Sequence, residues 1–382
     1  MKTVRFGIVG LGLMGREFAS AAARWCHLPD MQVRPEIVAI CNRSAAKFDW
    51  FTDNFPSITQ VTHDYRELLT NPDVDVVYIA VPHDLHEPMY CDTIRAGKHL
   101  MGEKPFGIDQ AANDAIRACM AQHPNVFVRC VTQFAFYPPV QRIGAMIDAG
   151  DFGRLIEVNA GFLHCSDLNP DKPINWKRTL AHNGAYGCMG DLGMHICHIP
   201  FRAGWRPRNV RAVLGDIITE RPDGSGGMAP CETWDNATLL CETADTDGRT
   251  FPMTLKTFRI APGHTNSWYL EIVGTRGGAR FSTRSPKRLD LFRYDGGEQR
   301  WQHADVGHEM AFKSITGGIF GASFSEVFMQ MWAAFLTELT GSRVPNRFAA
   351  CATADETALS HRLFTAALQS QETAGTVAVG GV

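Results

Sequence analysis

Three closely spaced glycines near the amino end constrain the fold of this chain more than any other feature. Gly10, Gly12 and Gly15 follow an apolar run over residues 4–9 and come directly before a helical pattern. In such a segment the first glycine permits a tight turn, the second lets the backbone approach a pyrophosphate, and the third lets the helix pack closely on the strand. The phosphates then lie at the amino end of that helix. Because the glycines open a strand–helix–strand unit, they predict dinucleotide binding.

The first third of the chain alternates apolar runs with helical patterns. Strands are expected at residues 4–9, 37–41, 76–81, 99–101 and 126–130, and helices at residues 16–25, 45–54, 89–96 and 111–122. The apolar runs are hydrophobic on both faces, as in buried parallel strands. This alternation predicts a doubly wound parallel sheet, the Rossmann type of α/β fold. We expect this domain to span residues 1–133.

The pattern changes after residue 153, where strands that alternate apolar and polar residues dominate. We expect strands at residues 155–162, 210–217, 237–241, 250–258, 268–273, 279–282 and 288–294, and helices at residues 324–340 and 353–371. Turns at residues 223–224 and 295–297 separate some of them. The alternation predicts an antiparallel sheet with one face more polar than the other. Residues 134–382 are therefore expected to form a second, α+β domain.

Composition limits the classes of partner. The 382 residues are 45% hydrophobic, enough for two cores, and carry a formal net charge of only −3. The small charge argues against nucleic acid or a membrane surface as the main partner. No apolar run reaches membrane-spanning length, and the chain begins directly with a strand instead of a signal peptide. The 11 irregularly spaced cysteines fit reduced thiols. We expect a soluble cytoplasmic globular protein.

The end of the second expected strand bears on cofactor choice. An acidic residue there would hold the adenosine ribose hydroxyls and repel a 2′-phosphate. This chain has Asn42, which can bond a hydroxyl but repels nothing, followed by Arg43 and Lys47, which can pair with a phosphate or point into solvent. The cofactor is therefore expected to be NAD or NADP, with the choice open.

Two further segments follow strands of the first domain. Val81, Pro82, His83 and His86 come at the end of the 76–81 strand, where a nicotinamide would lie. Lys104 comes at the end of the 99–101 strand, and the proline after it restricts its backbone. Ligands of open α/β sheets bind at these strand ends. The candidate cofactor contacts are Gly10, Gly12, Leu13, Met14, Gly15, Asn42, Arg43, Lys47, Val81, Pro82, His83, His86, Glu103 and Lys104.

A second chemical cluster lies in the second domain. Asp191 and His195 are four residues apart and so share one face of a helix. Histidine suits a proton-accepting role because its unperturbed pKa lies near neutrality. The two residues can also be a simple surface pair, or metal ligands together with His198. We expect no metal, because no further ligand cluster with suitable spacing accompanies them.

Together these motifs resemble the Gfo/Idh/MocA oxidoreductase family, the family of glucose–fructose oxidoreductase and inositol dehydrogenases. The resemblance covers nearly the whole chain: the glycines, the Pro82 to His86 loop, Glu103-Lys104-Pro105, and Asp191 with His195. It implies that Lys104, Asp191 and His195 are the catalytic trio of an NAD(P)-dependent dehydrogenase or reductase. It further implies hydride transfer to or from a secondary alcohol of a sugar, cyclitol or related polyol. The family fold is a Rossmann domain followed by an α/β domain with a large open antiparallel sheet. It implies that residues 134–382 bind the substrate and form a homo-oligomer, dimer or tetramer, through the exposed face of that sheet.

Three residues depart from the family pattern. Asn42 replaces an acid common in NAD-preferring members, His83 stands where asparagine is usual, and His198 stands where many members have aspartate. They leave the cofactor and the substrate open. The expected substrate contacts are Lys104, Tyr137, His164, Trp176, Lys177, Arg178, His182, Asn183, Asp191 and His195. Alternative functions are an NAD-dependent glycosidase that oxidises its substrate transiently, and a non-catalytic cofactor-binding regulator.

Overall fold

The chain forms two compact units. A computed structural model describes residues 1–317 and 319–380. Unit 1 comprises Met1–Phe136 and Met310–Thr357, and unit 2 comprises Tyr137–Glu309 and Ala358–Val382. The sequence-based division had assigned the whole of residues 134–382 to the second domain. By contacts, however, the segment Met310–Thr357 groups with the amino-terminal part.

Unit 1 contains a six-stranded parallel sheet in the order β3-β2-β1-β4-β5-β6. Its strands are β1 (Lys2–Val9), β2 (Val33–Cys41), β3 (Gln60–Thr62), β4 (Val76–Ile79), β5 (His99–Gly102) and β6 (Val128–Cys130). Its helices are α1 (Leu13–Ala23), α2 (Phe48–Asn54), α3 (Tyr65–Thr70), α4 (His86–Arg95), α5 (Gln110–Gln122) and α9 (Phe324–Leu339). The predicted doubly wound parallel sheet is confirmed. The short elements β3 and α3 were not predicted from the sequence.

The late helix α9 completes the core of unit 1. Its Trp332 is fully buried, with ring centroids 4.1 Å from Phe18 of α1, 5.0 Å from Tyr78 of β4 and 5.6 Å from Phe6 of β1. Buried aromatic pairs at such distances add to the stabilisation that comes from their buried area. These contacts are the physical reason why residues 310–357 belong to unit 1 although they follow most of unit 2 in the sequence.

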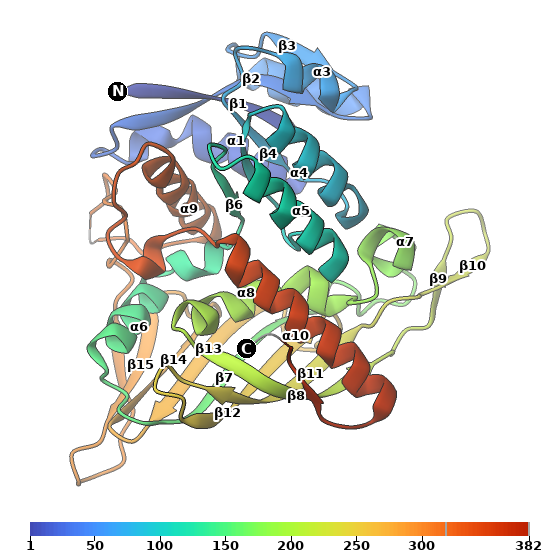
Figure 1. Ribbon diagram of the computed structural model, residues 1–382. Coiled ribbons are helices and arrows are strands. Elements are labelled where there is room, and N and C mark those ends of the chain that lie inside the picture. Colours follow the sequence, from blue (N-terminus) through green and yellow to red (C-terminus); the bar gives the residue numbers. More distant parts are fainter. Residues whose placement is uncertain (318, 381–382) are drawn as a thin grey trace. The chain divides into compact units, whose positions relative to one another are not determined.

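Unit 2 contains a nine-stranded sheet in the order β16-β15-β14-β13-β7-β12-β11-β8-β17, and a separate β9–β10 hairpin (Figure 1). The strands are β7 (Leu155–His164), β8 (Arg206–Gly215), β9 (Glu220–Pro222), β10 (Met228–Pro230), β11 (Asn236–Ala244), β12 (Thr250–Phe258), β13 (Asn266–Gly274), β14 (Gly277–Ser282), β15 (Arg288–Arg293), β16 (Gln302–Asp305) and β17 (Val377–Ala378). The large sheet is antiparallel as predicted except at one place, because β12 pairs in parallel with β7. It is therefore a mixed sheet.

The helices of unit 2 are α6 (Pro138–Ala149), α7 (Leu180–Asn183), α8 (Cys188–Arg202) and, from Ala358 onward, α10 (Ala354–Thr373). The four-residue α7 contacts the turn at Trp176–Arg178, whereas α6 and α8 contact strands of the sheet. α8 lies against β7 and β12, and α10 runs beside it (Figure 1). α10 also covers the β8 edge: Ser370 Oγ and Gln371 Oε1 accept hydrogen bonds from the backbone N–H groups of Ala212 and Leu214. Such cover protects an edge strand from pairing with other chains.

Candidate functional site

The glycine loop of unit 1 has the geometry that a dinucleotide requires. Gly10 has φ +97°, and a Cβ there would lie 2.2 Å from the carbonyl oxygen of Ala80. A Cβ on Gly15 would lie 2.4 Å from the carbonyl oxygen of Gly10, so helix and strand approach closely. At Gly12, the N-cap residue of α1, a Cβ would meet nothing within 4 Å. Leu13 and Met14 continue the helix from this open position, which fits a phosphate group.

The side chain of Asn42 braces this loop at the end of β2. Its Oδ1 accepts a hydrogen bond from the backbone N–H of Leu11 at 3.2 Å, and its Nδ2 donates to the carbonyl oxygen of Ser44 at 2.9 Å. Both functional atoms of the amide are thus engaged with backbone. Arg43 and Lys47, which follow, are exposed.

The loop after β4 is held by a buried histidine. The ring nitrogens of His86 lie 2.7 Å from the carbonyl oxygen of Pro105 and 3.0 Å from that of Val81, and the ring stacks on Tyr90. Burial lowers the pKa of His86 to about 4, although the two carbonyl oxygens favour the charged ring. His86 therefore connects the loops after β4 and β5. Its side chain has no exposed surface, so its position supports bracing of these loops more than direct contact with a cofactor.

Glu103, the residue before Lys104, is anchored from two sides. Its carboxylate accepts a hydrogen bond from the Tyr78 hydroxyl at 2.7 Å, and its carbonyl oxygen accepts one from the Tyr90 hydroxyl at 2.7 Å. Its other carboxylate oxygen accepts the backbone N–H of Lys104 at 3.3 Å. Glu103 is buried, while Lys104 is partly exposed at the carboxyl end of β5. Val81 and Pro82, at the end of the neighbouring β4, are partly exposed and His83 is buried.

In unit 2, Asp191 lies between two cations. The Lys177 ammonium is 3.0 and 3.1 Å from its two carboxylate oxygens, and Arg259 Nη2 donates to Oδ2 at 2.8 Å. Asp191 and Arg259 are almost completely buried, whereas the Lys177 side chain is 37% exposed. The two cations stabilise the ionised form of Asp191 and fix its orientation.

Arg259 belongs to a larger buried ion network. Its Nη1 is 3.6 Å from Asp167 Oδ2, and Asp167 also pairs with Lys172 at 2.7 Å and with Arg178 at 3.8 Å. Arg178, fully buried, makes a further ion pair with Asp235. These cations lower the pKa of Asp167 in spite of its burial. Arg178 was expected to contact substrate, but its guanidinium has no exposed surface and its position supports the network instead.

Two histidines lie near Asp191 in unit 2. His195 is one helical turn after it on α8, and the indole N–H of Trp268 donates to the His195 carbonyl oxygen at 3.0 Å. The Phe162 ring lies 5.6 Å from that of His195 and 5.9 Å from that of His164, at the end of β7. Burial lowers the pKa of His164 to about 4; nearby Asp191 opposes this shift.

The other expected substrate contacts differ in exposure. Trp176 is partly exposed, and its ring centroid lies 5.6 Å from the Lys177 ammonium. Tyr137 is buried against Phe281, and burial raises the pKa of its hydroxyl to about 12. His182 is exposed and Asn183 is buried. His198, on α8, is buried. In the described part of the chain, no group of three or more His, Cys, Asp or Glu side chains is placed to hold a metal ion.

Sequence reasoning missed three buried members of the ion network and a buried arginine beside it. Asp167, Arg221, Asp235 and Arg259 lie outside any motif, although all are buried. Arg221 donates to the carbonyl oxygens of Asn169 and Asp167. One signal was present: Arg259 directly follows the strand predicted at residues 250–258, so a charged side chain stands at the end of a predicted strand. That position parallels the placement of Lys104 in unit 1.

Comparisons with known proteins decide the family. The sequence model described as "Oxidoreductase family, NAD-binding Rossmann fold" (GFO_IDH_MocA) matches residues 4–129, and that of the GFO/IDH/MocA C-terminal domain matches residues 140–280. The chain belongs to the Gfo/Idh/MocA family. The predicted family, and with it an NAD(P)-dependent oxidoreductase, is confirmed.

Among Gfo/Idh/MocA relatives, levoglucosan dehydrogenase of Pseudarthrobacter phenanthrenivorans is 26% identical over 320 residues, which cover 78% of this chain and 79% of that protein. Trans-1,2-dihydrobenzene-1,2-diol dehydrogenase of Mus musculus is 29% identical, over 64% of this chain and 73% of that one. A solved structure of levoglucosan dehydrogenase with NADH and L-sorbose superposes with a TM-score of 0.87 at 21% identity, with 100% of each chain covered. This likeness confirms the fold.

Within the part of the chain that the structure describes, no helix combines the length and apolar character needed to cross a bilayer.

Proposed function

We propose that this chain is an NAD(P)-dependent dehydrogenase or reductase that acts on a secondary alcohol of a sugar, cyclitol or related polyol. Membership of the Gfo/Idh/MocA family and the activities named for its relatives support this proposal. The observation that carries it is the setting of Asp191, which is oriented by Lys177 and Arg259 one helical turn before His195. A carboxylate beside a histidine is suited to moving a hydroxyl proton.

Lys104 is assigned to the alcohol oxygen in this proposal. Its ammonium lowers the energy of the alkoxide that develops as hydride leaves, and it helps to move the proton. The Tyr78–Glu103 and Tyr90–Glu103 hydrogen bonds support this role, because they hold the backbone directly before Lys104. Fixed positioning of a charged group is more effective than a mobile charge in water.

His195 is assigned to take the hydroxyl proton at a nitrogen of its imidazole. Asp191 orients His195 or accepts a hydrogen bond from a neighbouring hydroxyl of the substrate. When bound, the nicotinamide supplies the hydride acceptor or donor. The glycine loop and the side chains after β2, β4 and β5 are assigned to hold the dinucleotide.

Substrate recognition is assigned to partly exposed groups near Asp191. Lys177 and Trp176 offer a cation and an aromatic face, and an aromatic face can pack on the apolar side of a sugar ring. With its lowered pKa, His164 is neutral at pH 7 and can both donate to and accept from hydroxyls. The exposed His182 and the buried Tyr137 and Asn183 complete the proposed set. Arg178 is assigned to hold the network in place.

The experiment is a panel of sugars, inositols, polyols and glycosides, each assayed with NAD and with NADP for reduced cofactor. We expect stoichiometric NAD(P)H from at least one free sugar or polyol. Lys104→Met should abolish turnover while dinucleotide binding, measured by fluorescence titration, changes less than about threefold. Lys2→Met, which removes a lysine from the opposite end of the same sheet, is the matched control and should keep full activity.

Other outcomes contradict the proposal in distinct ways. Hydrolysis of a glycoside without net reduction of the cofactor would instead support the alternative function, an NAD-dependent glycosidase. Dinucleotide binding without turnover of any compound would favour a regulator. Unchanged turnover in Lys104→Met would refute the role of Lys104.

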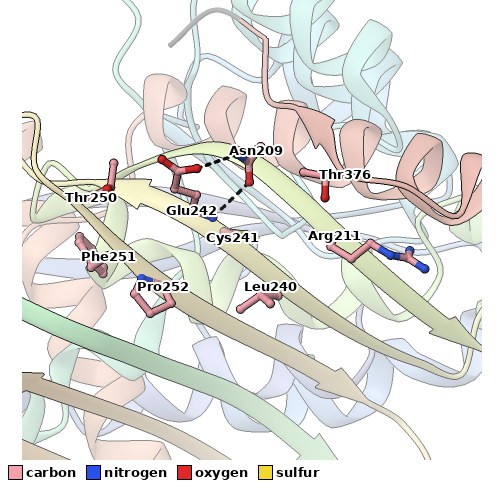
Figure 2. A pocket seen from close by; sticks show the side chains of 9 residues that line it. All are labelled: Asn209, Arg211, Leu240, Cys241, Glu242, Thr250, Phe251, Pro252 and Thr376. Atoms are coloured by element: carbon pink, nitrogen blue, oxygen red, sulfur yellow. Dashed lines mark hydrogen bonds between the residues drawn. The ribbon is translucent and has the colours of Figure 1, made fainter.

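We also propose that the protein is a homo-oligomer, dimer or tetramer, formed through the face of the nine-stranded sheet opposite α8. Val213 and Leu240 on this face are 59% and 51% exposed. A shallow cavity of about 360 Å³ lies around Leu240, Pro252 and Arg211, where Asn209 and Glu242 are joined by two hydrogen bonds (Figure 2). The mixture of exposed apolar, acidic and basic side chains suits a second copy of the same face.

Light scattering at micromolar concentration tests this assembly. We expect a mass of two or four chains, and we expect Leu240→Arg to lower it, since a charge would be buried without a partner. A monomeric wild-type protein would refute the proposal.

We further propose that the protein lies in the cytoplasm. All eleven cysteines are free thiols, which supports this location.

A further inference from the structure

The end of β2 lacks the group that usually selects NAD. The strand finishes at Cys41, and the next side chain, Asn42, is neutral. Both polar atoms of Asn42 are engaged with backbone: Oδ1 with the N–H of Leu11, and Nδ2 with the carbonyl oxygen of Ser44. A carboxylate at this point would bind the ribose 2′-hydroxyl and repel a 2′-phosphate. Asn42 instead stabilises the loop itself and leaves a phosphate unopposed.

Two cationic side chains follow this position in the sequence. Arg43, Ser44 and Lys47 are all exposed, and neither the Arg43 nor the Lys47 side chain has a hydrogen-bond or ion-pair partner among residues 1–317 and 319–380. Arg16, in the first turn of α1, adds a third cation near α2, the helix that follows Lys47, since its guanidinium lies 5.2 Å from the ring of Trp50. Unpaired cations at a strand end are available for an anionic ligand, and arginine binds phosphate oxygens with two parallel hydrogen bonds.

The nearest carboxylates after β3 are already engaged. Asp64 accepts the backbone N–H of Arg66 at 2.9 Å as the cap of α3, and a carboxylate oxygen of Glu67 accepts the hydroxyl of Thr62 at 2.5 Å. Both raise the pKa of the buried Cys41 thiol, after burial itself, to about 11. Both are exposed residues that follow β3, the strand that pairs with β2 at Cys41. Asp49 and Asp53 on α2 are exposed to solvent.

From this arrangement we infer that the cofactor of this chain is NADP(H). Arg43 binds the 2′-phosphate, Ser44 and Lys47 add a hydroxyl and a second cation, and Asn42 holds the loop in place. The inference rests on the proposed function, because it assumes that the glycine loop binds a dinucleotide. It goes beyond that proposal by naming which of the two cofactors the site selects and which residues select it.

The test is a direct measurement of dissociation constants for NADPH and NADH by isothermal titration calorimetry on the whole purified chain. We expect NADPH to bind about tenfold tighter or better, a difference typical of one or two charge-assisted hydrogen bonds. Arg43→Ala should remove most of this difference by weakening NADPH binding alone. The preference for NADPH should also shrink as the salt concentration is raised from about 50 mM to about 500 mM, because salt screens exposed ion pairs.

Two further variants sharpen the result. Arg34→Ala removes an exposed arginine from the opposite end of the same strand and should leave both constants unchanged. Asn42→Asp introduces an acidic group at the end of β2 and should reverse the preference, so that NADH binds more tightly than NADPH. Melting temperatures of all three variants confirm that the protein remains folded.

The outcomes separate the inference from the proposal beneath it. NADH binding as tightly as NADPH, or an undiminished preference in Arg43→Ala, would overturn the assignment of NADP(H) and leave the proposed oxidoreductase intact. Failure to bind either dinucleotide would contradict both.

Discussion

Replacing Arg259 with methionine should strongly destabilise unit 2. The substitution keeps an unbranched side chain but removes the cation that pairs with Asp191 at 2.8 Å and Asp167 at 3.6 Å. The arginine is 1% exposed and the two carboxylates are 2% and 3% exposed, so water does not replace the lost partner. Removing one member of a buried ion pair costs about 3–5 kcal/mol.

The lower end of that range applies to Arg259. Lys177 remains 3.0 Å from Asp191, and Lys172 remains 2.7 Å from Asp167, so each carboxylate keeps one cation. We therefore expect a loss of about 3 kcal/mol. For a unit of this size, 1 kcal/mol lowers the melting temperature by about 2–4 °C, which gives a decrease of about 6–12 °C.

Differential scanning calorimetry measures the decrease, with Arg249→Met as the control. Arg249 is 59% exposed and pairs with the exposed Asp247 at 3.2 Å, so its loss should shift the melting temperature by less than about 2 °C. A double-mutant cycle with Asp191→Asn should show strong coupling to Arg259. A decrease in Arg259→Met no larger than that of the control, or additive effects in the cycle, would refute this reasoning.

Three further predictions concern unit 1. Gly10→Ala should unfold unit 1 or abolish expression of the protein, because the new Cβ would lie 2.2 Å from the Ala80 carbonyl oxygen at φ +97°. Gly12→Ala should fold normally, as circular dichroism would show, and should only weaken dinucleotide binding in a fluorescence titration. His86 has a folded-state pKa of about 4, below its unfolded value of 6.5, so the stability that its neutral ring contributes is fully present above pH 6.5 and is lost as the pH falls toward 4. Melting temperatures at pH 7 and pH 5 should therefore differ less in His86→Gln than in wild type. Asp109→Ala removes the cap that accepts the Ala112 N–H at 2.8 Å and should cost about 1 kcal/mol in urea unfolding, whereas Asp114→Ala, on the exposed side of α5, should cost much less.

The parts of the fold that local patterns encode were predictable from the sequence. The glycine loop, the parallel strands around it and the turn at Asp223-Gly224, which the structure places in the β9–β10 hairpin, follow from residue type and periodicity. The membership of α9 in unit 1 did not follow, because it depends on Trp332 meeting Phe6, Phe18 and Tyr78 across most of the chain. The parallel pairing of β12 with β7 likewise depends on topology and has no local signature.

The residues of the candidate site likewise fall into those that a local motif marks and those that only the fold brings together. Lys104 and Asp191 could be singled out because each stands in a compact motif. Arg259 and Asp167, which pair with each other and with other members of the buried network, come from separate loops, and nothing in the sequence marks two distant charged residues as partners. His86 was placed in the correct loop, but its burial between two carbonyl oxygens became visible only in three dimensions.

The discontinuity of unit 1 has a consequence for biosynthesis. Domains generally fold as they leave the ribosome, the amino-terminal one first. Here the first 136 residues emerge without the helix that buries Phe18 and Tyr78, and that helix is translated only after the whole stretch from Tyr137 to Glu309. The nascent sheet therefore exposes aromatic surface while more than 170 further residues are added. Chaperones that bind exposed apolar surface on nascent chains should therefore bind this chain until Trp332 has emerged. A fragment that ends at Phe136 should aggregate when it is expressed alone.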